Sequence, residues 1–111
     1  MSGSPDGVTV IAVRPSWVQV RDGEGNTLYS GIMNGGDTVP IPAETVEPAI
    51  QVGESGAVYF SVNGETYGPA GARGAVTSDL SLTPDVLTAR YMPADPAADK
   101  YLGPVLSGLA L

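Results

Sequence analysis

The sequence contains neither cysteine nor histidine, and only five of its 111 residues are basic. Without cysteine the chain has no disulfide, no thiolate nucleophile and no thiolate metal ligand. Without histidine it lacks the side chain most often used as a general base or as a transition-metal ligand. The single lysine, Lys100, falls in a segment expected to be a tail. We therefore expect no enzyme, and no catalytic, cofactor-binding or metal-binding residues.

Positive charge and long apolar runs are equally scarce. Twelve acidic residues against five basic ones give a net charge of −7, which disfavours nucleic acid and anionic lipid surfaces as partners. No stretch approaches the roughly 18 apolar residues of a membrane helix. The N-terminus lacks the basic and apolar regions of a signal peptide. Residues 1–7 are expected to be a flexible leader or the end of a linker.

What the sequence does contain is a series of short runs with the two-residue periodicity of β-strands. Gly-rich turns separate these runs, as is typical of sandwiches and barrels. We expect residues 8–87 to form one all-β domain, a small antiparallel β-sandwich, Ig-like or barrel-like, of seven to eight short strands. Periodicity leaves sandwich and barrel strand orders open. The expected strands are residues 8–14, 17–22, 27–33, 37–41, 49–52, 58–62, 66–67 and 75–82.

The first hairpin spans residues 16–33 and turns at Asp22-Gly23-Glu24-Gly25-Asn26. Strict alternation assigns its side chains to two faces. The core face is expected to carry Val18, Val20, Leu28 and Ile32, and the outer face Trp17, Gln19, Arg21, Tyr29 and Met33. The acidic turn also suggests a calcium-binding loop. However, Met33 stands where a calcium loop would close with an acidic residue, which favours a simple turn.

The second hairpin turns at Asn63-Gly64, the strongest short hairpin signal, because a type I′ turn needs positive φ at both positions. Its strand 58–62 is expected to point Val58, Phe60 and Val62 inward, with Tyr59 and Ser61 outward. Pro40, Pro42 and Pro48 are expected to lie in a loop or a protected edge strand.

The composition changes after residue 83. Residues 83–87 predict a final helical turn or a cap. Residues 88–111 are rich in proline and small residues, which predicts a flexible, disordered C-terminal tail. Residues 101–111 are apolar for a free tail, so docking on the domain or on a partner stays open as an alternative.

Three aromatic residues are candidates for partner binding: Trp17, Tyr29 and Tyr59 share the outward parity of their strands. Exposed together, these rings would form a patch that docks a protein or a glycan. The alternative is that they pack beneath another strand or loop.

The order of these features resembles the C-terminal domain of RodZ, a bacterial cell-shape protein. The stretches that carry the resemblance are SWVQVRDGEGNTLYSGIMNGGDT and IQVGESGAVYFSVNGETYGPAGARGAVTSDLSLTPDVL. Together with the preceding strand they cover about residues 8–87. Family members commonly have Asn where this chain has Glu54.

The resemblance implies a periplasmic β domain at the end of a single-pass inner-membrane protein. In that family a separate cytoplasmic helix-turn-helix domain contacts the actin-like protein MreB, so this fragment should not bind MreB itself. The implied role is a non-catalytic module that contacts the peptidoglycan elongation machinery, through a transpeptidase or scaffold proteins. The alternatives are a peptidoglycan- or glycan-binding module and a passive folded spacer.

Overall fold

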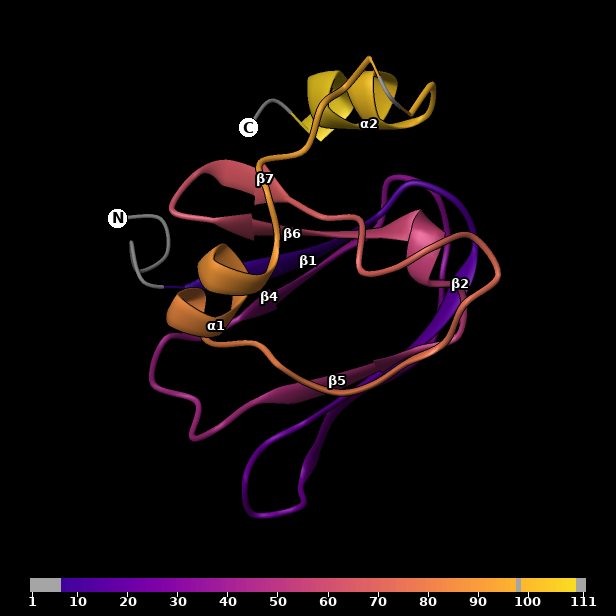
Figure 1. Cartoon of the computed structure of the whole chain (residues 1–111). Coiled ribbons are helices and arrows are strands. Elements are labelled where there is room, and N and C mark those ends of the chain that lie inside the picture. The colour runs from indigo at the N-terminus through magenta and orange to yellow at the C-terminus, as the bar shows by residue number, and fades with distance from the viewer. Residues whose placement is uncertain (1–6, 98, 110–111) are drawn as a thin grey trace.

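The computed structural model describes residues 7–97 and 99–109. Eight antiparallel strands form two four-stranded sheets, with orders β4-β1-β6-β7 and β3-β2-β5-β8 (Figure 1). The elements are β1 (Val8–Ala12), β2 (Ser16–Arg21), β3 (Thr27–Met33), β4 (Thr38–Ile41), β5 (Ala49–Val52), η1 (Ser55–Ala57), β6 (Val58–Val62), β7 (Glu65–Tyr67), β8 (Thr77–Ser81), α1 (Pro84–Arg90) and α2 (Leu102–Leu109). The predicted all-β antiparallel sandwich is confirmed. Apart from Gly7, the expected leader lies outside the described residues.

The main core lies between the two sheets. Alternate side chains of each strand point inward and contact the opposite sheet, as two half-buried antiparallel sheets require. Phe60, Met33 and Ile50 are the largest side chains of this core with almost no exposure. The rest of its buried members are Val8, Val10, Ala12, Val18, Val20, Ile41, Val52, Val58, Val62, Ala70, Leu80, Leu82 and Leu87.

Helix α1 packs against this core beside β6 (Figure 1). It begins at Pro84, a favourable first helical position because proline needs no N–H partner there. Its one buried residue, Leu87, belongs to the main core. Just beyond it the Tyr91 hydroxyl donates to the Ala70 carbonyl at 2.9 Å, and the Tyr91 ring lies 5.7 Å from that of Phe60. The predicted helical turn at residues 83–87 is thus confirmed and extended.

The first hairpin contains a register shift that overturns part of its predicted pattern. Arg21 lies opposite Thr27, but Val20 lies opposite Tyr29, so Leu28 is an extra residue in β3. A one-residue shift exchanges the two faces of a strand. The prediction that Leu28 and Ile32 are core is therefore wrong: they are 45% and 57% exposed. Met33, predicted to face outward, is fully buried.

The second hairpin has the predicted form. Asn63 and Gly64 have φ of 54° and 84°, the positive values of a type I′ turn. Val58, Phe60 and Val62 belong to the main core, as predicted. Pro40 lies in β4, which is an edge strand of its sheet, so its missing N–H costs no ladder hydrogen bond on the free side.

Residues 91–97 and 99–109 cross over the outer face of the β4-β1-β6-β7 sheet, which we call the covered sheet (Figure 1). Tyr67 bridges to Pro93, and the Ala94 N–H donates to the Thr66 carbonyl at 2.8 Å. Helix α2 then places Leu102, with no exposure, in a second apolar cluster.

This cluster also contains Ile11, Val13 and Tyr59, whose side chains point away from the main core. Over its described residues, the segment 88–111 therefore differs from the expected flexible tail, and the docked alternative is what the structure shows. The physical reason is a patch of apolar side chains on the outer face of β1 and β6. Covering that patch with an apolar helix has a lower free energy than leaving it exposed to water.

Candidate partner-binding site

The three aromatic residues predicted to bind a partner lie on three different surfaces. Trp17 lies on the outer face of the β3-β2-β5-β8 sheet, which we call the open sheet, and is 38% exposed. Tyr29 is half-buried and packs against the main core, because the register shift turns it inward. Tyr59 points outward from β6 but is only 3% exposed beneath residues 91–109. The structure therefore does not bring them together into one patch.

Trp17 instead lies opposite Ile32 in the neighbouring strand, where both side chains are exposed. The next pair on the same face, toward the hairpin turn, is polar, with Gln19 opposite Ser30. Gln19 also lies opposite Gln51 of β5. The open sheet thus carries an exposed apolar pair next to polar residues, and a further exposed apolar side chain, Leu28, lies nearer the turn on β3. No segment of residues 7–97 or 99–109 covers this pair. Sequence reasoning missed Ile32 because strict alternation placed it in the core.

The backbone beneath Trp17 is tied down. Its carbonyl accepts the Gly53 N–H at 2.8 Å, just beyond the end of β5. The adjacent Ser16 hydroxyl accepts the Glu54 N–H at 3.0 Å. These contacts fix the backbone that carries the exposed ring, which lowers the conformational entropy that this strand would lose when a partner binds.

The acidic loop of the first hairpin is a turn stabilised by its own aspartate. The Asp22 carboxylate accepts the backbone N–H groups of Glu24 and Asn26, both at 2.9 Å, and the Asn26 side-chain amide at 3.1 Å. These bonds, led by the one from the Asn26 side chain, lower the pKa of Asp22. The Asp22 carboxylate is thus hydrogen-bonded within the loop, which is consistent with the predicted simple turn. Among the residues that the structure describes, no three His, Cys, Asp or Glu side chains cluster as metal ligands would.

Glu54 connects both sheets at the opposite end of the sandwich. Its carboxylate accepts the N–H groups of Gly74 at 2.7 Å and Gly56 at 3.1 Å, and lies 3.4 Å from the Arg14 guanidinium. The Gly74 N–H is the strongest of several contacts that lower the pKa of Glu54. Glu54 itself has φ of −131°, so this position has extended backbone and requires no residue that tolerates positive φ.

The fold defines a class: a small antiparallel β-sandwich, one sheet of which is covered by the chain's own C-terminal segment. The family model of the RodZ C-terminal domain matches residues 9–81 of the chain. The chain therefore belongs to the RodZ C-terminal domain family, the family of a bacterial cell-shape protein. Neither the curated proteins nor the solved structures contain a significant match. Within the described part of the chain, neither helix has the length and apolarity needed to span a bilayer.

Proposed function

We propose that this domain is a non-catalytic protein-interaction module of a RodZ-like cell-shape protein. In this proposal it lies in the periplasm, at the end of a single-pass inner-membrane protein whose cytoplasmic part contacts MreB. The domain then contacts a periplasmic portion of the cell-elongation machinery, a transpeptidase or a scaffold protein. Family membership supports the general role.

One observation carries the assignment of the contact face. The chain covers the apolar outer patch of one sheet with its own C-terminal segment, but leaves Trp17 and Ile32 exposed on the other sheet. Tryptophan is enriched among residues that dominate binding energy, because it buries a large apolar area with few rotatable bonds. The polar residues around the pair match the polar rim of a protein interface. A protein partner therefore suits this face.

The test is a titration of the ¹⁵N-labelled chain with purified periplasmic portions of the elongation transpeptidase and its scaffold proteins. We expect saturable amide shifts centred on β2 and β3. Trp17→Ala should stay folded, keep the spectrum of the main core and lose most of the affinity. Val86→Ala removes an equally exposed apolar side chain on α1, away from the open sheet, and should bind normally.

Two other outcomes would redirect the assignment. Saturable shifts on the same face with peptidoglycan fragments, but not with proteins, would favour a glycan-binding module. If no amide shifts with any titrant while the domain is folded, the interaction proposal fails for these partners. Unchanged cell shape after deletion of the domain from the full protein would then establish a passive spacer.

A further inference from the structure

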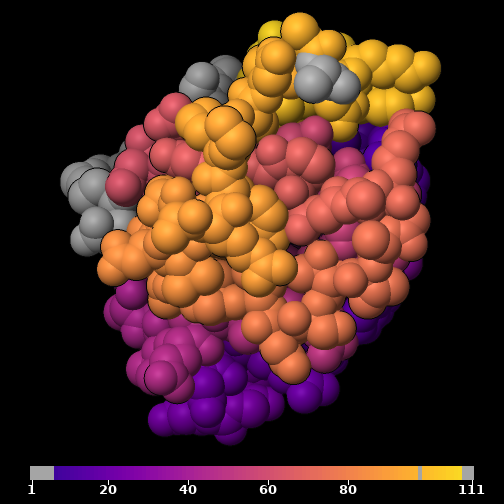
Figure 2. All heavy atoms as spheres, viewed as in Figure 1, coloured from indigo at the N-terminus to yellow at the C-terminus, as the bar shows by residue number. Residues whose placement is uncertain are grey.

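We propose that a groove on the covered side of the molecule binds a short acidic peptide segment through Arg14, Arg73 and Lys100. The groove has a volume of about 640 Å³ and lies between the loop that carries Arg73 and the segment that leads into α2. Figure 2 shows that segment, in yellow, at the top of the molecule beside the salmon-coloured loop around residue 72. A groove of this volume is in the usual range for ligand sites, about 300–1,000 Å³.

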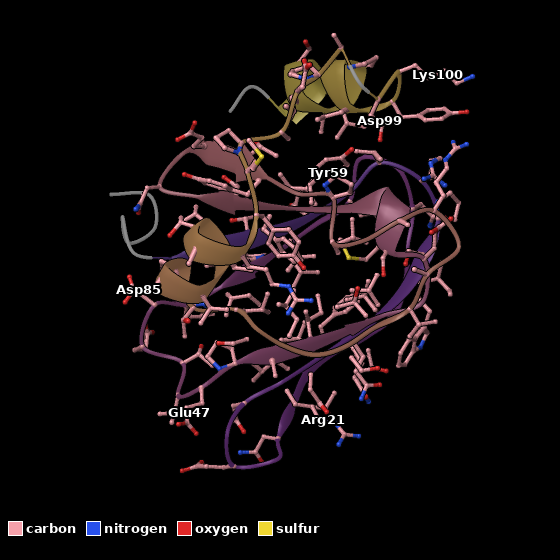
Figure 3. All side chains as sticks on the ribbon, in the orientation of Figure 1. Arg21, Glu47, Tyr59, Asp85, Asp99 and Lys100 are labelled. Atoms are coloured by element: carbon pink, nitrogen blue, oxygen red, sulfur yellow. The ribbon has the colours of Figure 1, made fainter. Side chains whose placement is uncertain are left out.

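Basic residues line the groove, although the chain as a whole is acidic. Three of the five basic residues line it, although the whole chain has a net charge of −7. One carboxylate, Asp99, also lines it, but accepts the Tyr59 hydroxyl at 2.8 Å and the Tyr101 N–H at 2.9 Å. In Figure 3 Tyr59, Asp99 and Lys100 lie at one end of the molecule, and Arg21 lies at the other. Arg14 is paired with the Glu54 carboxylate at 3.4 Å and Asp99 lines the groove, so three cations stand against two carboxylates. The remaining excess of one positive charge favours an anionic ligand.

Two of the three cations are held around one aromatic ring. The Arg14 guanidinium carbon lies 5.8 Å from the centre of the Tyr101 ring, and the Lys100 ammonium lies 5.3 Å from it. Both distances are within cation–π range. The Arg14 Nη1 lies 3.4 Å from the Glu54 carboxylate, and the buried Arg14 Nε has no acceptor among the described residues.

The third cation is held by a close backbone approach. A Cβ added to Gly56 would lie 2.9 Å from the Arg73 Cα, so only glycine lets the Arg73 loop pack this closely on η1. The same loop is fixed by the bond from Gly74 to Glu54 and by the Gly71 N–H, which donates to the Ser55 carbonyl at 3.3 Å. The backbone that carries Arg73 is therefore fixed, which reduces the backbone entropy lost when a ligand binds.

An acidic peptide fits this site better than a polyanion does. Pro69, Ala72 and the two tyrosine rings provide apolar lining for the backbone and aliphatic parts of a peptide. A nucleic acid or an anionic membrane would have to approach the whole domain, whose net charge of −7 repels it. A short segment with one or two carboxylates interacts mainly with the local field of the groove.

The test is an NMR titration of the full ¹⁵N-labelled chain with the acetylated and amidated peptide Glu-Ala-Glu, and with Gln-Ala-Gln as its neutral match. We expect saturable shifts around Arg14, Arg73 and Tyr101 with the acidic peptide alone. Arg73→Gln and Lys100→Gln should each weaken binding about two- to fivefold, as expected for partly exposed ion pairs. Arg21→Gln, a matched loss of one charge outside the groove, should leave the affinity unchanged.

Ionic strength and the open sheet supply two independent checks. Binding should weaken when added salt reduces the Debye length from about 10 Å to about 3 Å. Trp17→Ala should bind the peptide normally, so this result stands or fails separately from the proposed function. Equal binding of Gln-Ala-Gln, equal loss of affinity in Arg21→Gln, or displacement of the peptide by inorganic phosphate would overturn the proposal.

Discussion

The outer face of the covered sheet carries Ile11 and Tyr59, both buried, whereas that of the open sheet carries Trp17 and Ile32, both exposed. Each outer face thus carries a group of apolar side chains, and each sheet consists of four antiparallel strands. The difference is made by residues 91–97 and 99–109, which cross one face and leave the other uncovered (Figure 1). Apolar surface on an outer face is therefore no guide to function until the rest of the chain is placed.

The contrast extends to electrostatics. On the covered side, Tyr59 is tied to Asp99 and three cations surround the adjacent groove. On the open side, the exposed pair is flanked by uncharged Gln19 and Ser30. We therefore propose different occupants for the two sides: a charged ligand for the covered side and a partner that buries apolar surface for the open side.

The largest expected loss of stability comes from truncating Leu102, through which α2 packs on the covered sheet. Leu102→Ala removes a fully buried side chain from the second cluster and should cost about 2–5 kcal/mol. Amide hydrogen exchange should show the loss in α2 and in the outer residues of β1 and β6, because the main core is a separate cluster. Leu28→Ala, the same change on an exposed site, should cost about 0.5 kcal/mol or less. Equal protection of α2 in both variants would contradict the docked arrangement.

The next largest effect is expected at Glu54, where the two sides meet. Glu54→Ala leaves the Gly56 and Gly74 N–H groups without their acceptor and should cost about 1–2 kcal/mol in urea unfolding. Glu44→Ala, in an exposed loop, is the matched control and should have little effect.

Glu54 also predicts a pH dependence. Its pKa is lower in the folded chain than in the unfolded one, so its contribution is present above its unfolded pKa. That contribution is lost as the pH falls through the folded pKa, below about pH 4.5. Glu54→Gln should therefore lose stability less steeply on acidification than the unmodified chain does. Identical acid unfolding curves would show that this carboxylate is not coupled to folding.

A smaller effect is expected at the hydroxyl of Tyr59. Tyr59→Phe keeps the ring in the second cluster but removes the bond to Asp99, which should cost about 1 kcal/mol. Burial first, and then Asp99, raise the pKa of Tyr59 above its ordinary value of 10.0. The resulting stabilisation is present below pH 10.0 and is lost as the pH rises above it.

Denaturant titrations at neutral and alkaline pH check this prediction. The unmodified chain should lose stability above pH 10.0 more steeply than Tyr59→Phe does. Tyr67→Phe is the control, because the Tyr67 hydroxyl makes a surface bond to Glu65 at 3.3 Å, and its loss should change stability less than the loss of the Tyr59 hydroxyl does. A larger loss for Tyr67→Phe than for Tyr59→Phe would contradict the buried arrangement.

The features that sequence predicted correctly depend on local chemistry. Asn63-Gly64 requires a tight turn whatever surrounds it, and Pro40 is excluded from central strands by its missing N–H. The eight strands follow from alternation within each run, and Pro84 marks a helix start by its fixed φ. None of these inferences needs to know which segments pack together.

The features that sequence missed depend on contacts between distant residues. The shift at Leu28 exchanges the faces of β3, and nothing in the local pattern marks the extra residue. The docking of α2 depends on an apolar patch about 90 residues earlier in the chain, at Ile11 and Val13. The aromatic patch failed for both reasons, because the shift turned Tyr29 inward and the docked segment covered Tyr59.

The smallest effect is the coupling between Trp17 and Ile32 on the open sheet. Directly opposite side chains of this kind stabilise a sheet by about 0.2–1 kcal/mol. A double-mutant cycle with Trp17→Ala and Ile32→Ala in urea unfolding measures that coupling directly, since each single variant removes the same contact. Because both side chains are exposed, neither variant should approach the cost of Leu102→Ala. A loss of that size for Trp17→Ala would show that the Trp17 ring contributes to stability as a core residue does. The proposal that Trp17 is the main partner contact on the open sheet would then fail.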